Sequence, residues 1–179
     1  MHPLVAQAET FCLAAHAAVG QLRKYTNKDY HTHPFAVRDR LKAALGDRCT
    51  PEMECGALLH DVIEDTSVKR RIILDTFGFE VLRIVMGLSD SSTKDDGSRK
   101  HRKAIDRAHI ANQPWDVQTI KACDLIDNME SIEKHDLGFA KVYVPEKRLI
   151  LDVLVRAEPK LLERCWQLVT DFEKKHGTE

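Results

Sequence analysis

The chain has 179 residues, of which 43% are hydrophobic and 31% are charged, and its formal net charge at pH 7 is −1. This composition is typical of a soluble globular protein, and we expect one domain over residues 1–179. A net charge so close to zero argues against nonspecific nucleic-acid coating, so we expect no nucleic-acid partner. A local basic pocket for a small phosphorylated ligand remains compatible with it.

The cysteines and the first residues bear on the cellular compartment. Five cysteines, scattered and without a CxxC pair, predict neither a disulfide framework nor structural zinc, and they favour a reducing, cytoplasmic location. Residues 1–7 combine neither a basic stretch nor a long apolar run, so we expect no signal peptide and no membrane span.

Apolar residues recur with the helical period along nearly the whole chain. A first amphipathic helix is predicted over residues 4–22, and a second from Pro34 to a stop at Gly46. A third is predicted to start at residues 50–52 and to run into the segment that holds His60 and Asp61. Ser67 is a candidate cap for a short helix that ends before Gly78, and residues 81–88 form the next one.

Residues 91–98 are the one extended polar, turn-rich stretch, and we expect a mobile loop near the functional site. Helical patterning resumes over residues 99–110 and again from Pro114 to about Met129. Gly138, Pro145 and Pro159 punctuate the last two helices. No convincing strand pattern appears, so we predict an all-α fold of about eight or nine helices.

The segment Leu58-Leu59-His60-Asp61-Val62-Ile63-Glu64-Asp65-Thr66 carries four potential metal ligands or proton-transfer groups in an otherwise apolar setting. Such groups are costly to bury unless they are paired, hydrogen-bonded or metal-bound. In a helix, His60 and Glu64 share one face, as do Asp61 and Asp65. The alternative is a hydrogen-bonded core pair, and the two acidic residues one turn later favour a metal or catalytic site instead.

One helical turn cannot complete a metal shell, so further ligands are expected elsewhere in the chain. The candidates are His33, directly before Pro34, and Asp124, one turn before Asn128. Taken singly, His33 could be a helix cap and Asp124 a surface acid. Together with the first pair they make an N₂O₂ set that suits Mn²⁺, Fe²⁺ or Mg²⁺.

Two basic clusters bear on the substrate. Arg23-Lys24 precede His33, and residues 99–103 follow the polar loop. Each cluster alone is typical of a solvated charged face. Beside a hydrolytic metal site, both become candidate phosphate clamps.

Over about residues 4–155 the chain resembles the HD-domain hydrolases of the RelA/SpoT type in their small single-domain form. The matching elements, in chain order, are Arg23-Lys24, Tyr30-x-x-His33-Pro34, His60-Asp61-x-x-Glu64-Asp65-Thr66, Phe77-Gly78 and Lys121-x-x-Asp124-x-x-x-Asn128. The resemblance implies an HD-domain helical bundle. It also implies removal of the 3′-diphosphate from an alarmone nucleotide such as ppGpp, with release of pyrophosphate and Mn²⁺ as the usual metal.

The resemblance also implies roles for single residues. Those roles are metal binding by His33, His60, Asp61 and Asp124, water activation by Glu64 and Asp65, base binding by Arg23 and Lys24, a ribose contact by Asn128 and a phosphate contact by Arg99.

Alternative functions stay open at this point. Residues 27–29 lengthen the gap between Arg23-Lys24 and His33 relative to the long family members, which leaves guanine or adenine open as the base. The substrate could therefore be (p)ppApp or another 3′-phosphorylated nucleotide. An HD-type nucleotidase or dNTP phosphohydrolase is a second possibility, and a nucleotide-binding regulatory protein or antitoxin is a third. Oligomeric state and use of NADPH-like substrates are not predicted.

Overall fold

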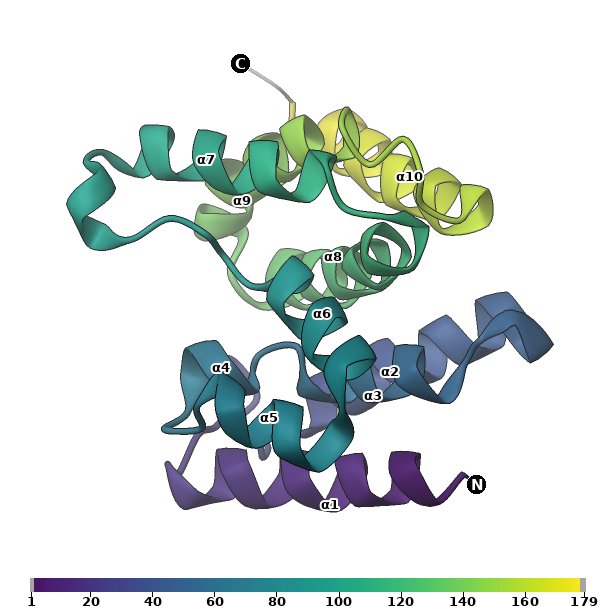
Figure 1. Ribbon diagram of the computed structural model, residues 1–179. Helices are drawn as coiled ribbons and strands as arrows, with labels where there is room; N and C mark the ends of the chain where they lie inside the picture. Colours follow the sequence, from purple (N-terminus) through teal and green to yellow (C-terminus); the bar gives the residue numbers. More distant parts are fainter. Residues whose placement is uncertain (1, 178–179) are drawn as a thin grey trace. The chain divides into compact units, whose positions relative to one another are not determined.

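The structure, a computed structural model, describes residues 2–177 (Figure 1). These residues form nine α-helices of eight residues or more, the one-turn helix α4 and two 3₁₀ turns. They contain no named strand, and one isolated bridge pairs Leu22 with Asp29. The prediction of an all-α fold is confirmed. The chain divides into two compact units, Met1–Ser89 and Asp90–Glu179, which are described separately below.

The first unit holds the helices α1 to α6. Their bounds are α1 (Pro3–Ala18), α2 (Thr32–Leu45), α3 (Pro51–Leu59), α4 (Val62–Asp65), α5 (Arg70–Phe77) and α6 (Phe79–Leu88), with a 3₁₀ turn at Gly46–Arg48. The second unit holds α7 (Arg99–Ala111), α8 (Trp115–His135), α9 (Leu137–Leu151) and α10 (Pro159–His176), with a 3₁₀ turn at Lys94–Asp96.

Helix α3 is the centre of the first unit, because every residue from Met53 to Leu59 is buried and the helix packs against α1, α2 and α6. Its start is specified locally. Thr50 caps the helix by accepting a hydrogen bond from the Met53 amide at 3.3 Å, and Pro51 occupies the first turn. A helix buried along its whole length carries its last residues into the interior, where the functional segment begins.

Ion pairs fix α2 against its neighbours in the first unit. Arg38, only 9% exposed, donates to Glu9 of α1 at 2.7 Å. Lys42, one turn later on α2, lies 3.2 Å from Glu54 of α3. Helix α2 is therefore tied to α1 and to α3 by charged contacts as well as by apolar packing, and the position of its first turn is set with it.

In the second unit, α8 packs against α7, α9 and α10. Gln118, fully buried on α8, donates to the carbonyls of Ile110 and Ala111 at 3.0 and 3.2 Å and accepts from the Arg156 amide at 2.8 Å. One amide side chain thereby joins the end of α7 to the turn before α10. Leaving such backbone groups unsatisfied in the interior is costly, so Gln118 is a structural residue.

Several helix boundaries differ from the sequence prediction. The first helix ends at Ala18 instead of Leu22, because Gly20 adopts a φ of 63° that turns the chain. The third helix stops at Leu59, and a new turn, α4, begins at Val62.

The prediction of Ser67 as a helix cap is wrong, because the N-cap of α5 is Lys69. Pro145 does not interrupt a helix but lies inside α9. Pro159, in contrast, occupies the first turn of α10 as predicted.

Within the predicted loop, the backbone amides of Ser91 and Ser92 donate to the Asp106 carboxylate at 3.1 and 2.9 Å. The mobility of residues 91–98 stays a prediction.

None of the described helices combines the length and the apolar character needed to cross a membrane. All five cysteines are free thiols, and burial, with a smaller effect of the Asp61 charge, raises the pKa of Cys12 to about 12.

We expect Gln118→Met to lower the free energy of unfolding by about 2–3 kcal/mol, because it removes three hydrogen bonds between a fully buried side chain and backbone groups while keeping the side-chain volume. Urea denaturation followed by circular dichroism measures this change. The matched control is Gln167→Met, since Gln167 is exposed and its amide bonds only to Asp171 on the same helix. Equal stability of the two variants would remove Gln118 from this structural role.

Candidate metal centre

Three of the predicted metal ligands come together in the first unit. His33 lies in the first turn of α2, His60 directly follows α3, and Asp61 precedes α4. Asp61 Oδ2 lies 2.9 Å from His60 Nε2 and 3.6 Å from His33 Nε2. One potential ligand atom from each residue falls within 4.8 Å of the other two. Of the histidines, His33 is 2% exposed and His60 is 4% exposed, so His33 is more than a surface helix cap.

The hydrogen bonding of His60 suits metal ligation. Its Nδ1 lies 2.8 Å from the carbonyl oxygen of Ala57, one turn back on α3. A carbonyl can only accept, so Nδ1 carries a proton, and Nε2, which faces Asp61, is the nitrogen available to a metal. Metal-bound histidines commonly donate their other ring nitrogen to a carbonyl in this way. The chemistry of the three donors therefore fits a divalent ion.

Tyr30 supports this cluster from the segment before α2. Its hydroxyl donates to Asp61 Oδ2 at 2.7 Å, and its ring packs edge-on against His33 with 5.8 Å between the ring centroids. The sequence pattern included Tyr30, three residues before His33, but gave it no role. The hydrogen bond indicates that Tyr30 orients the Asp61 carboxylate.

Glu64 and Asp65 are exposed on the single turn of α4. Thr66 closes that turn, because its hydroxyl donates to the Val62 carbonyl at 2.6 Å and accepts from the Val68 amide at 3.2 Å. Asp65 also accepts a hydrogen bond from the Gln21 side chain at 2.8 Å. The turn places two carboxylates directly after His60 and Asp61 along the chain, and both are candidate proton acceptors.

Arg23 and Lys24 lie in a short loop that a hydrogen-bonded frame holds in place. The loop is closed by the bridge between Leu22 and Asp29 and by a 2.7 Å bond from the Arg23 amide to the Lys28 carbonyl. Asn27 turns the loop with a φ of 53°. The two basic side chains therefore stand on a defined loop of the first unit.

In the second unit, Asp124 is only 5% exposed and does not lie on the surface. It accepts hydrogen bonds from Lys121 at 2.8 Å and from Asn128 at 2.5 Å, all three on α8. The lysine balances the charge of the carboxylate, and the amide orients it. The predicted spacing thus yields one organised polar cluster, and metal binding by Asp124 stays a prediction.

Lys147, on α9, has no counterpart in the sequence prediction. Its ammonium group lies 4.7 Å above the centre of the Tyr143 ring. Burial, followed by the charge of Lys121, lowers the pKa of Lys147 to about 8. A lone lysine in a helical pattern gives no signal of this setting.

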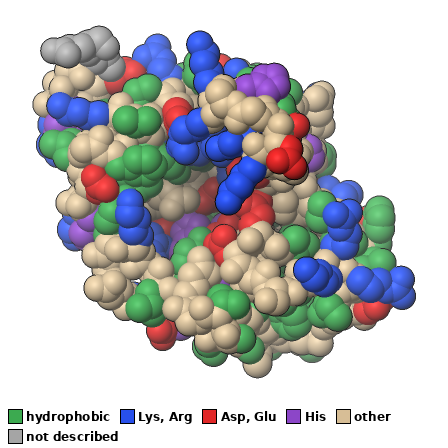
Figure 2. Space-filling view, turned by 90° about the vertical axis from the view of Figure 1, so that its left-hand side faces the viewer, with side chains coloured by type: hydrophobic (Ala, Val, Ile, Leu, Met, Phe, Trp, Pro, Cys, Tyr) green, Lys and Arg blue, Asp and Glu red, His purple; other side chains and the backbone are tan. Residues whose placement is uncertain are grey.

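Arg99 makes a two-fold hydrogen bond to Glu146, with both distances at 2.8 Å. The pair lies at a pocket of about 380 Å³ between α7 and α9. Figure 2 shows several Lys and Arg side chains gathered near the upper centre of that view. The other residues that line the pocket are Lys100, Lys103, Ala104, Arg107 and Leu149.

Curated relatives share sequence with this chain. A probable guanosine-3′,5′-bis(diphosphate) 3′-pyrophosphohydrolase of Synechocystis is 30% identical over 74% of this chain and 17% of its own length. A guanosine-3′,5′-bis(diphosphate) 3′-pyrophosphohydrolase of Danio rerio is 28% identical over 59% of this chain and 56% of its own length. The chain thus spans about a sixth of the first relative and somewhat more than half of the second.

Solved structures share the fold. A structure described as a metazoan ortholog of SpoT that hydrolyses ppGpp superposes with a TM-score of 0.84 at 19% identity, covering 99% of this chain and 98% of the other. A Listeria monocytogenes protein gives a TM-score of 0.62 at 22% identity, covering 79% of this chain and 99% of the other.

The family model described as "HD domain" matches residues 8–138, which include all the predicted site residues. The resemblance to RelA/SpoT-type HD hydrolases is confirmed. The chain belongs to the HD domain family.

Proposed function

We propose that this chain is a metal-dependent phosphohydrolase that removes the 3′-diphosphate of (p)ppGpp-type nucleotides and releases pyrophosphate. The observation that carries the proposal is the buried cluster of His33, His60 and Asp61 in an HD-domain chain. The names of the two curated relatives supply the substrate class. We propose Mn²⁺ as the metal on the resemblance to RelA/SpoT-type hydrolases, and the nitrogen and oxygen donors, without thiolate, are compatible with Mn²⁺, Fe²⁺ or Mg²⁺. We propose a cytoplasmic location as well, because the five free cysteines suit a reducing compartment.

In the proposed reaction, a water oxygen attacks the phosphorus attached to the ribose 3′-oxygen. The new bond joins phosphorus to the water oxygen, and the bond from phosphorus to the 3′-oxygen breaks. Asp65, with Glu64 beside it, accepts the one proton that the water loses, and the 3′-oxygen takes up a proton from solvent as it leaves. A divalent ion, when bound, lowers the pKa of water and offsets phosphate charge. His33, His60 and Asp61 would hold that ion, with Tyr30 fixing the orientation of the Asp61 carboxylate.

The second unit contributes to the same proposal. We assign Asp124 to the metal, Asn128 to the ribose and Arg99 to a phosphate group, while Arg23 and Lys24 of the first unit contact the base. The buried, hydrogen-bonded state of Asp124 and the basic pocket around Arg99 support these roles. We also propose that residues 1–179 form a single HD hydrolase domain.

The direct test is pyrophosphate release from purified, metal-stripped protein. We expect turnover of ppGpp that requires added Mn²⁺, with ppApp and dGTP run in parallel. Hydrolysis of ppApp alone would keep the chemistry and change the base. Inactivity toward both alarmones would overturn the proposed function.

We expect Asp61→Ala and Asp124→Ala to reduce turnover to background, because each removes a carboxylate from the proposed metal shell. Mn²⁺ affinity, measured by calorimetry, should fall by more than the about 10- to 100-fold typical of losing a supporting residue. Circular dichroism should stay unchanged. The matched control is Asp171→Ala, since Asp171 is an exposed carboxylate on α10. Full activity in either site variant would exclude that residue from the shell.

Arg23→Ala should mainly raise KM for the nucleotide, because Arg23 is assigned to binding the base and not to the reacting phosphate. Steady-state kinetics with ppGpp separates the two parameters. A fall in kcat at unchanged KM would contradict the assignment.

A further inference from the structure

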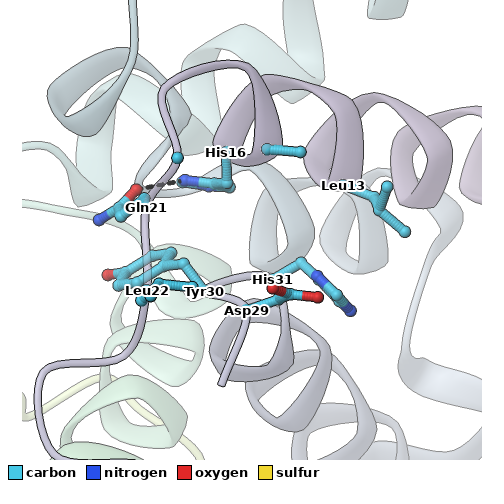
Figure 3. A pocket seen from close by; sticks show the side chains of 9 residues that line it. Leu13, His16, Gln21, Leu22, Asp29, Tyr30 and His31 are labelled. Carbon is cyan, nitrogen blue, oxygen red and sulfur yellow. Dashed lines mark hydrogen bonds between the residues drawn. The ribbon is translucent and has the colours of Figure 1, made fainter. Parts of the chain in front are cut away.

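A hydrogen-bonded chain leads from the interior of the first unit to Asp65. His16, near the end of α1, is 1% exposed, and its Nδ1 lies 2.6 Å from Gln21 Oε1. The Gln21 amide nitrogen in turn donates to Asp65 Oδ2 at 2.8 Å. Figure 3 shows His16 and Gln21 pointing toward one another, on the wall of a pocket of about 270 Å³ that Tyr30 also lines.

The Asp65 carboxylate determines which groups donate and which accept in this series of hydrogen bonds. An ionised carboxylate only accepts hydrogen bonds, so the NH₂ group of Gln21 faces Asp65 and its oxygen faces His16. His16 Nδ1 must then carry a proton. His16 Nε2 is buried and has no hydrogen-bond partner among the described residues, which favours its unprotonated form. Burial lowers the pKa of His16 and outweighs the opposing effect of the Gln21 bond, so the ring is neutral.

Gln21 has a rigid backbone, whereas Asp65 stands on a single exposed turn. The backbone N–H of Gln21 donates to the backbone carbonyl of His16 at 3.1 Å, and the backbone carbonyl of Gln21 accepts from the backbone N–H of Tyr30 at 3.2 Å. The bridge from Leu22 to Asp29 follows directly. A side chain on such a frame can restrain a carboxylate that its own helix leaves exposed.

We propose that Gln21, oriented by His16, is a positioning residue that holds Asp65 Oδ2 so that Oδ1 receives the proton of the attacking water. This role rests on the proposed function, because it assumes that Asp65 serves water activation. Gln21 itself touches neither the metal ligands' donor atoms nor the reacting phosphate in this scheme. Its effect should therefore appear in kcat and not in metal affinity.

The first test is Gln21→Met, which keeps the length of the side chain and removes the donor. We expect kcat for ppGpp to fall by about 10- to 100-fold, the usual effect of losing a supporting hydrogen bond at a catalytic group. KM and the Mn²⁺ dissociation constant should each change by less than about threefold. Gln167→Met is the matched control, because Gln167 also donates to an aspartate, Asp171 at 2.7 Å, on a different helix.

Two substitutions of His16 separate orientation from packing. His16→Leu fills the space but removes the Nδ1 donor, so the Gln21 amide is free to rotate and kcat should fall. His16→Asn places an amide NH₂ close to the position of Nδ1 and should restore kcat above the leucine variant. Recovery by asparagine, the poorer filler of the cavity, is not expected of a purely structural histidine.

A readout independent of turnover is the ¹⁵N NMR spectrum of histidine-labelled wild-type protein. A signal of neutral His16 with a proton on Nδ1, which is lost or shifted in Gln21→Met, supports the hydrogen-bonded chain. This readout does not depend on turnover, so absence of ppGpp hydrolysis would overturn the proposed function and leave the hydrogen-bonded chain supported. An Nε2–H tautomer would overturn the chain. Unchanged kcat in Gln21→Met, or an equal fall in Mn²⁺ affinity, would overturn the positioning role.

Discussion

The burial of His60 at the end of α3 is the constraint on which the candidate metal centre depends. Helix α3 is enclosed along its length, so the residue that follows Leu59 is delivered into the interior with it. An imidazole in that position needs partners for both nitrogens. The Ala57 carbonyl satisfies one nitrogen from within the same helix, which leaves the other directed at Asp61. His33 reaches the same carboxylate because α2 packs against α3, with ion pairs from α2 to α1 and α3 in support.

The first unit separates rigid from adjustable groups. The candidate metal ligands lie at or next to the ends of packed helices, where neighbouring contacts limit their motion. The acidic pair of α4 instead stands on an exposed single turn, closed by Thr66 and reached by Gln21. Ligands need a fixed geometry, whereas a proton acceptor must exchange with solvent after each turnover. The difference in burial between His60 and Asp65 matches these two requirements.

The sequence predicted the helical class and the grouping of His60, Asp61, Glu64 and Asp65, because both follow from local periodicity and composition. It did not predict the break between α3 and α4. His60 and Asp61, the two residues at the break, keep right-handed helical dihedrals, with φ and ψ of −57° and −36° at His60. The apolar pattern of the sequence also continues across them, so nothing in the sequence marks the break. The contacts of Tyr30 and Gln21 join residues 31 and 44 positions apart. Spacing within a motif carries no information about such pairs, which depend on how α1 and α2 pack.

The loop between Gln21 and Tyr30 has a consequence for how specificity can diverge. Its two ends are joined to each other by a backbone hydrogen bond, and each end reaches one acidic residue of the site, Asp65 or Asp61. The tip, around Asn27, lies beyond the bridge that closes the loop. Insertions or deletions at the tip can therefore reshape the loop without moving the residues at its base. With the base contacts that we propose for Arg23 and Lys24, base preference and bond cleavage are separable traits, and one can change while the other is retained.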